Sequence, residues 1–202
     1  DEDEGEEDVD AKCQYFKSGG EAPKATSMSA GIGVPHLLRF HAPSLAKDTS
    51  DSATSFFGTF RRLFERIAEE DCVASPYPGE EHTGDAAESW RDNLSMYPSF
   101  GHPDTPYVCA NEADELACVR AFYQFWSSFS SRKCFAWKDV HETRQAKDRR
   151  IKRLLEKENK RSRDAARREY NEAIHGLVTF IRRRDPRVKA HHAQQQNKAS
   201  NE

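Results

Sequence analysis

Apolar side chains recur at helical spacing in three parts of the chain, and these repeats predict a mainly α-helical protein. The first repeat lies in residues 52–71, where one helical face carries Phe56, Phe60, Leu63, Phe64 and Ile67. Ser52 or Thr54 can cap the start of this helix, since a hydroxyl oxygen accepts a hydrogen bond from a free backbone N–H there. We expect the Phe-rich face to turn inward.

A second repeat begins after Asn111, a good N-cap residue, and runs through residues 116–131. Its ridge is aromatic, which suits a small core packed against the first helix. Residues 133–145 then predict a short extended or turn segment with two aromatic anchors. The expected core aromatic residues of the whole chain are Phe56, Phe60, Phe64, Phe122, Phe125, Trp126, Phe129 and Trp137.

The third predicted helix is long, from about Ala146 to Arg184, because this stretch contains no proline and Gly176 is its only strong breaker. At 1.5 Å per residue such a helix spans roughly 58 Å. Near its end, a packing stripe is formed by Ile174, Leu177, Val178 and Ile181. Pro186 ends the helix, and the residues beyond it predict a weaker helix that fades into a tail.

The segments between these helices define the organisation. The chain begins with "DEDEGEEDVD", a block that cannot bury apolar area, and the apolar cluster "VPHLLRF" is the one part of the first fifty residues that could dock on a body. Prolines and acids mark residues 74–111 as a long irregular connection between the first two helices. We therefore expect an acidic, largely disordered tail (1–50), a helical body with a long loop (51–143, loop 74–111), a long basic helix (144–185) and a C-terminal tail (186–202).

Charge sharpens this division. The chain is 36% apolar and 32% charged, with a formal net charge of −3. Residues 1–143 hold 13 Lys and Arg against 26 Asp and Glu, whereas residues 144–190 hold 17 against 7. Such an asymmetry indicates a polyanion-binding segment attached to a neutral or acidic body.

On a helical projection the cations of the long helix fall within about a third of its circumference, beside a narrow apolar side. That spacing can follow a phosphate backbone, and cations also suit the C-terminal end of a helix. The candidate RNA-binding residues are Arg149, Arg150, Arg153, Lys157, Lys160, Arg161, Arg167, Arg168, Arg182, Arg183 and Arg184, and the apolar side consists of Ile151, Leu154, Leu155, Ala165 and Ala166.

Spacing alone leaves a second interpretation open, in which this helix is a solvated spacer or a coiled-coil-like arm of a protein–protein adaptor. A coiled coil needs sustained apolar a and d positions, and residues 156–169 offer only alanines. The apolar side is also too thin for a membrane-surface or calmodulin-binding helix.

Other function classes find little support in the sequence. The five cysteines show no CxxC spacing, so we expect no disulfide framework and a reducing compartment. The eight histidines show neither HExxH nor zinc-like pairing with cysteine, and no phosphate loop or GxSxG elbow is present. We expect no enzymatic activity, cofactor, metal or membrane span. Because the sequence starts at Asp1 rather than Met, we expect a piece of a longer protein.

Several of these segments, in their order and spacing, resemble a known family. They are "FFGTFRRLFERIAEED", "FYQFWSSF", "FAWKD", "DRRIKRLLEKENK" and "IRRRDPRV", and the resemblance covers about half of the chain. It is to the Zuotin-homology region of ribosome-associated J-proteins, closest to the DnaJ homolog subfamily C member 21 type.

The resemblance implies a helical ribosome-docking module that contacts rRNA and ribosomal proteins of 60S or pre-60S particles. It implies a cytoplasmic co-chaperone, with a nucleolar location left open, whose J-domain outside this chain recruits Hsp70 in late 60S biogenesis. A Zuotin-like role at the ribosomal tunnel exit is the lesser match. The enlarged loop 74–111 departs from the family pattern.

That loop contains the tripeptide by which J-domains activate Hsp70, His102-Pro103-Asp104. In a J-domain a basic helix precedes the tripeptide and another helix follows it. Here the preceding residues 85–101 include one basic residue, Arg91, and are interrupted by Pro98 and Gly101. We therefore interpret the tripeptide as a chance occurrence and expect this chain to anchor a co-chaperone rather than to activate Hsp70.

Overall fold

A computed structural model of the chain describes residues 31–72, 74, 94–109, 116–143 and 148–200. Within these ranges the elements are helical, without a strand, so the predicted mainly α fold is confirmed. No helix in them is both long and apolar enough to cross a membrane. The elements are α2 (Val34–Arg39), η1 (Pro43–Ala46), α3 (Phe56–Cys72), α5 (Val119–Ser127), η3 (Ala136–Lys138), α6 (Arg149–Arg182) and α7 (Pro186–Ser200).

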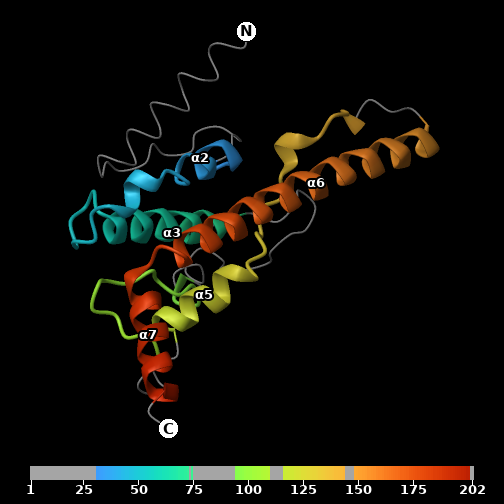
Figure 1. Ribbon diagram of the computed structural model, residues 1–202. Coiled ribbons are helices and arrows are strands. Elements are labelled where there is room, and N and C mark those ends of the chain that lie inside the picture. Colours follow the sequence, from blue (N-terminus) through green and yellow to red (C-terminus); the bar gives the residue numbers. More distant parts are fainter. Residues whose placement is uncertain (1–30, 73, 75–93, 110–115, 144–147, 201–202) are drawn as a thin grey trace.

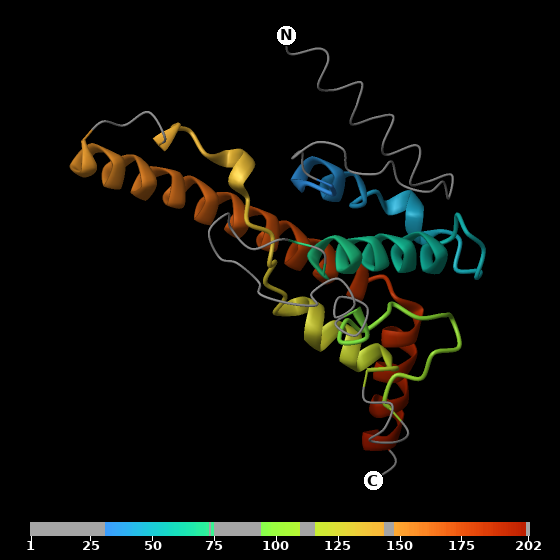
Figure 2. The ribbon, with the colours of Figure 1, turned by 180° about the vertical axis from the view of Figure 1, so that it is seen from behind.

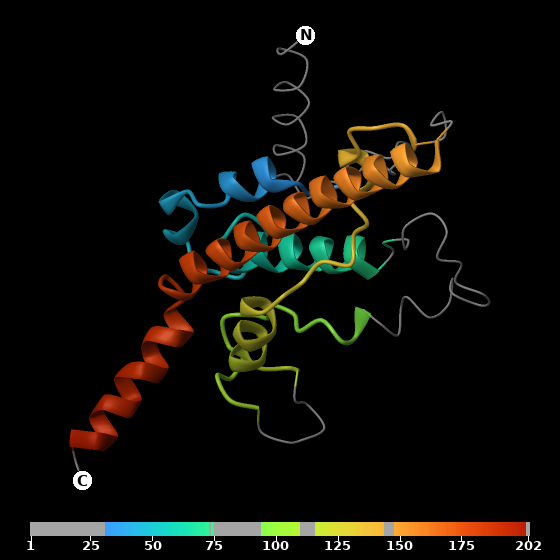
Figure 3. The same ribbon diagram turned by 90° about the vertical axis from the view of Figure 1, so that its right-hand side faces the viewer.

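The long helix α6 organises the molecule. Its C-terminal half crosses the body formed by α2, α3 and α5, and its N-terminal half extends beyond them (Figure 1, and from behind in Figure 2). The predicted packing stripe is buried on this C-terminal half, where it is joined by Tyr170. Helix α7 then leaves α6 in a different direction (Figure 3).

An aromatic core joins α3 to α5. The ring of Phe64 lies 4.8 Å from Phe122 and 4.8 Å from Trp126, measured between centroids. Of the eight aromatic residues named from the sequence, Phe125 and Trp137 are half-buried at its edge, and the other six are buried. Phe100, which the sequence analysis did not include, is fully buried among them.

Phe100 comes from the long loop and fills the centre of this core. Its ring centroid lies 5.0 to 6.5 Å from those of five other phenylalanines on α3 and α5. The indole N–H of Trp126 donates to the carbonyl of Pro98 at 3.0 Å, which holds the loop beside α5. Residues 94–109 lack regular structure from residue 95 on, as the sequence predicted, but they also contribute to the core of the body.

Two boundaries drawn from the sequence need correction. Residues 34–39, assigned to the acidic tail, form α2, and Leu37 is fully buried, so the docking potential of "VPHLLRF" is realised. The C-terminal tail begins with a full helix, α7, rather than a fading one. Residues 1–30, which include the acidic block, and most of loop 74–111 lie outside the described residues.

Helix α5 also starts later than expected. Its N-cap is Cys118 rather than Asn111, which lies outside the described residues. The reason is that the first backbone N–H groups bond to the preceding loop: Val119 donates to Pro106 and Arg120 donates to Tyr107. These two N–H groups are therefore satisfied by the loop, and α5 begins directly after Cys118. Helix α6 begins close to its predicted start, with the Asp148 side chain accepting from the backbone of Arg150.

Two cysteines are joined, contrary to the expectation that none would be. Cys109 and Cys118 form a disulfide across nine residues, with their Cα atoms 5.1 Å apart. The loop that bonds its carbonyls to the first turn of α5 brings them together. Spacing rules built on CxxC pairs do not detect such a bridge, since it depends on how the loop folds back. Cys72 and Cys134 are free.

Buried polar groups fasten the helices to one another. Lys133, 7% exposed, places its ammonium 2.8 Å from the Glu70 carboxylate of α3 and donates to the Tyr170 hydroxyl of α6 at 3.3 Å, so that one side chain links the two helices. Asp71 accepts from the Tyr97 and Ser131 hydroxyls. Burial, followed by the nearby Asp71 charge, raises the pKa of Tyr97, which keeps this phenol protonated as a donor.

The turn between α6 and α7 carries the most deeply buried ion pair. Asp185 is fully buried and 2.8 Å from the guanidinium of Arg187, and its side chain also caps α7 by accepting from the Arg187 backbone. The Arg187 guanidinium donates to the carbonyls of Phe100 and His102, each at 2.9 Å. One arginine thus ties the start of α7 to the loop that inserts Phe100.

We predict that Arg187→Met destabilises the protein by about 3–5 kcal/mol, because it leaves the buried Asp185 carboxylate without its counter-charge. The matched control is Arg183→Met, an exposed arginine four residues earlier, for which a change within about 0.5 kcal/mol is expected. Urea unfolding followed by circular dichroism measures both. Equal, small losses in the two variants would contradict the role of this ion pair.

Candidate nucleic-acid interface

The cations predicted for RNA binding are mostly displayed to solvent. Nine of the eleven are exposed, and Arg167 and Arg184 are half-buried. Seven exposed ones share the N-terminal two thirds of α6 and make no ion pair with another described residue: Arg149, Arg150, Arg153, Lys157, Lys160, Arg161 and Arg168. We call these seven the basic face. From its first to its last residue it is about 29 Å long.

The opposite side of this half-helix is covered by the segment that precedes it. Residues 136–143, the strap, run back along α6 (Figures 1 and 3). Asn159, 3% exposed, accepts from the backbone N–H groups of Val140 and His141 and donates to the His141 carbonyl. Ser162 donates to the Lys138 carbonyl at 2.7 Å. Since the strap uses one side of the helix, the basic face is the side left for a partner.

Acidic residues are sorted away from this face. At 100° per residue, Asp164 is the only acid of α6 that falls in the same third of the circumference, and it pairs with Arg167 at 3.2 Å. Two of the other four make different contacts: Glu158 lies 2.6 Å from His141 of the strap, and Glu156 lies 3.9 Å from Lys152. The basic face therefore presents a nearly uniform positive charge, which favours a polyanion.

The arginines at the end of α6 are placed differently. Arg184 stacks on the Phe180 ring at 3.7 Å and donates to the Phe180 carbonyl, and Arg182 lies 5.8 Å from the Tyr123 ring. Arg167 donates to the Lys133 carbonyl. Arg167, Arg182 and Arg184 thus contact other residues of the protein, and for this reason we do not include them in the basic face.

The narrow apolar side predicted for α6 is not packed at its outer end. Ile151 is 52% exposed and Leu154 is 63% exposed, whereas Ala166 lies against the core. The strap covers the helix from Glu158 onward and leaves these two side chains free of it. They adjoin the basic face and widen the surface that a partner could contact.

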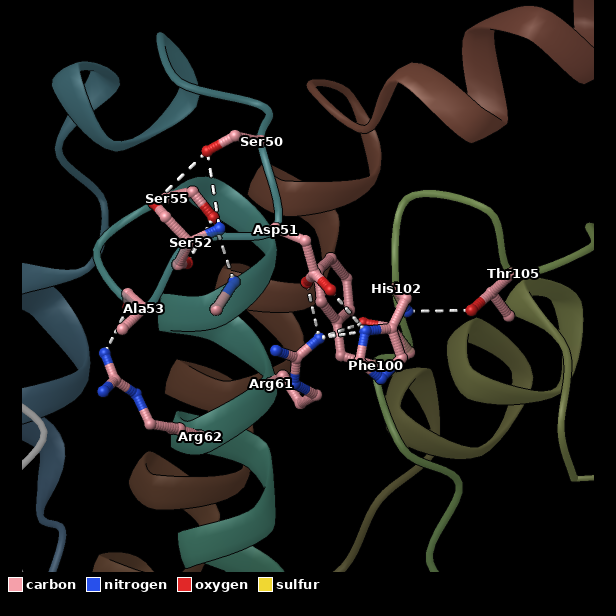
Figure 4. A network of polar contacts seen from close by, with 12 residues as sticks. Ser50, Asp51, Ser52, Ala53, Ser55, Arg61, Arg62, Phe100, His102 and Thr105 are labelled. Carbon is pink, nitrogen blue, oxygen red and sulfur yellow. Dashed lines mark hydrogen bonds and ion pairs between the residues drawn. The ribbon is translucent and has the colours of Figure 1, made fainter.

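The tripeptide His102-Pro103-Asp104 forms a tight turn that is fastened to α3 (Figure 4). The His102 ring nitrogen Nδ1 lies 2.7 Å from Asp51 and 2.8 Å from Arg61, and these two are paired at 2.9 Å. The hydrogen bond with His102, followed by that with Arg61, lowers the pKa of Asp51. Gly101 precedes the turn at a φ of +75°, a conformation that suits glycine.

This geometry gives the tripeptide a structural role. Residues 95–109 are turns and irregular backbone, so no helix adjoins the tripeptide on either side within that range. The buried guanidinium of Arg187 donates hydrogen bonds to the carbonyls of Phe100 and His102. The turn closes the loop that buries Phe100, and the residues next to the tripeptide in the sequence carry no sign of this role.

Other important residues were also missed from the sequence. Asn159 and Lys133 carried no signal, because their roles depend on the strap and on Glu70, which are remote in the chain. Asp185 did carry one: an Asp directly before Pro186 has the form of an N-cap followed by proline at the first helical position. This signal marks a well-defined start for the helix after α6, which the sequence predicted only as a weak one.

The fold thus defines a mainly α-helical module that holds out a long cationic helix. Residues 87–189 match the Zuotin-like family defined by the zuotin homology domain, and the chain belongs to this family. The matched range includes α5, the strap and α6, which are the elements that build the basic face and its support. No solved structure matches the chain.

Curated relatives agree with this family. The chain is 38% identical to DnaJ homolog subfamily C member 21 of Danio rerio over 77% of its own length and 25% of that protein. It is 27% identical to J protein JJJ1 of Saccharomyces cerevisiae, over 79% and 28% respectively. With Zuotin of the same yeast the identity is 26%, over 66% and 33%. The chain therefore spans about a quarter of the length of the first of these relatives.

We predict that Asn159→Ala releases the strap. The backbone N–H groups of Val140 and His141 lose their acceptor, which should cost about 1–3 kcal/mol and speed hydrogen exchange at these two amides. Glu156→Ala, an exposed change one turn away, serves as the control and should leave both exchange rates unchanged. Unaltered exchange in the Asn159 variant would show that the strap is held by other contacts.

Proposed function

We propose that this chain is the ribosome-docking segment of a J-protein co-chaperone that acts in late 60S subunit biogenesis. In this proposal the basic face binds rRNA phosphates, ribosomal proteins add further contacts, and a J-domain elsewhere in the parent protein recruits Hsp70 to pre-60S particles. The role is one of binding rather than catalysis, and its place is the cytoplasm, with a nucleolar fraction left open. Membership of the zuotin homology domain family and the similarity to J-proteins support it.

The observation that carries the proposal is the sorting of charge on α6. Seven cations face solvent without an acidic partner among the described residues, and the strap occupies the other side of the helix. A helix that served only as a solvated spacer would be expected to pair its charges along its length, as Lys152 does with Glu156. Unpaired cations at one-turn spacing are what a phosphate backbone neutralises.

We expect binding to 60S subunits to fall steeply with salt, because each phosphate contact releases condensed counterions. Changing Arg149, Arg150 and Arg153 to Glu should weaken binding strongly and reduce the slope of log affinity against log salt by roughly two to three units. Co-sedimentation with purified 60S subunits over a salt series measures both quantities.

The matched control reverses three exposed cations elsewhere, Arg120, Lys189 and Lys198, which gives the same change in net charge. This variant should bind nearly as well as the unchanged chain, since net charge alone does not create the contact. Binding that ignores salt, or that survives the triple change on α6, would refute rRNA docking by the basic face.

A separate prediction concerns the His102 tripeptide. Because its ring and carbonyls are engaged by Asp51, Arg61 and Arg187, this chain should not stimulate the ATPase of Hsp70, and His102→Gln should leave the rate at its basal value. A single-turnover ATPase assay with a J-domain as positive control tests this. Stimulation that disappears in the His102 variant would instead make the chain a self-contained activator.

Two alternative functions are each favoured by a specific observation. A Zuotin-like chaperone at the ribosomal tunnel exit would use the same basic face on translating ribosomes, and the 26% identity to Zuotin supports it. A helical protein–protein adaptor with a coiled-coil-like arm is favoured by the exposure of Ile151 and Leu154. In the adaptor case binding would be lost on changing these two residues to Ser and would depend little on salt.

A further inference from the structure

The acidic block at residues 1–10 is a second polyanion within reach of the basic face. It holds eight Asp and Glu without a Lys or Arg, in the order DEDEGEEDVD. The basic face holds seven cations that no described acid neutralises. A surface of this kind attracts any nearby anion, and the attraction is strongest for one attached to the same chain.

The structure shows where the chain that carries this block joins the body. Ile32 is 3% exposed, its backbone N–H donates to Glu70 at 2.8 Å, and its carbonyl accepts from the Lys133 ammonium at 3.3 Å. The same ammonium is 3.3 Å from the hydroxyl of Tyr170 on α6. The chain therefore enters the body at the level of Tyr170, two residues along α6 from Arg168, on the buried side of the helix.

Distance permits contact. The 21 residues between the block and Ile32 can span at most about 75 Å when fully extended. The basic face runs from its Arg168 end to Arg149 over about 29 Å. Tethered this closely, the block acts at an effective concentration on the order of millimolar.

We propose that residues 1–10 bind the basic face in cis and compete there with an external polyanion. Two observations assign residues 1–10 to this face. Their charge is opposite to that of the face, and their attachment to the body at Ile32 keeps them within reach of it. The block occupies the cations until a ligand with more phosphates displaces it. This inference rests on the proposed function only in using the same face.

Docking is tested without any RNA by zero-length carbodiimide crosslinking of the full 202-residue chain, followed by mass spectrometry. Amide bonds from the carboxylates of residues 1–10 to Lys157 and Lys160 should form in preference to those to Lys189 and Lys198, which are also exposed but lie on α7. The preference should vanish at high salt. Crosslinks spread evenly over the four lysines, or none to α6, would overturn the proposal whether or not the chain binds RNA.

Competition is tested with a labelled 20-base-pair RNA duplex as the probe. Changing the eight acids to Asn and Gln keeps the length of the chain and should tighten binding roughly three- to tenfold at low salt, the factor expected when a tethered competitor is removed. A variant with the ten residues in scrambled order keeps the charge and should bind like the unchanged chain.

The two tests separate the possible failures. If the duplex does not bind at all while the crosslinks to Lys157 and Lys160 form, the proposed function fails and the docking in cis stands. If neutralising the acids leaves duplex affinity unchanged at low salt, competition is refuted even where the duplex binds well. Tighter binding without the crosslinks would indicate long-range repulsion between block and probe, and that result also refutes docking.

Discussion

The burial of Phe100 between α3 and α5 is the contact on which the rest of the body depends. Helix α5 has nine residues, too few to be stable by itself, and it gains its stability from aromatic packing. Phe100 touches both helices, yet it arrives on a loop whose backbone polar groups must be satisfied once they are buried. The Arg187 guanidinium meets this need at the carbonyls of Phe100 and His102. The position of α7 and the tight turn at His102 follow from it.

This arrangement explains why α6 can be anchored at one end only. Its buried apolar stripe ends at Tyr170, and the basic face begins at Arg168. The packed half and the cationic half of α6 therefore meet at these two residues. Arginine and lysine side chains are too costly to bury in such number, and the outer half therefore cannot share the core. The strap replaces the core there with hydrogen bonds to Asn159 and Ser162.

The sequence was sufficient to predict what local periodicity encodes. Phe56, Phe60 and Phe64 show the inward face of α3 directly, and the cations of α6 recur at helical spacing. It was insufficient wherever a partner is remote. Phe100 lies in a Pro- and Gly-rich stretch, where an aromatic residue has no periodic neighbours to mark it as core. Lys133 meets Glu70 across 63 residues, and neither position alone distinguishes a buried ion from a solvated one.

The projection of α6 also has an electrostatic consequence. Residues 1–143 carry twice as many acids as bases, but the described residues among them hold nine of each, so the body itself does not add to the attraction of a polyanion. Charges are screened over about 8 Å at physiological ionic strength, whereas the basic face extends about 29 Å along the helix. Its outer cations, beginning at Arg149, therefore act on a ligand independently of the charges of the body. Because the described part of the body is balanced in charge, the attraction of a polyanion is concentrated on the basic face.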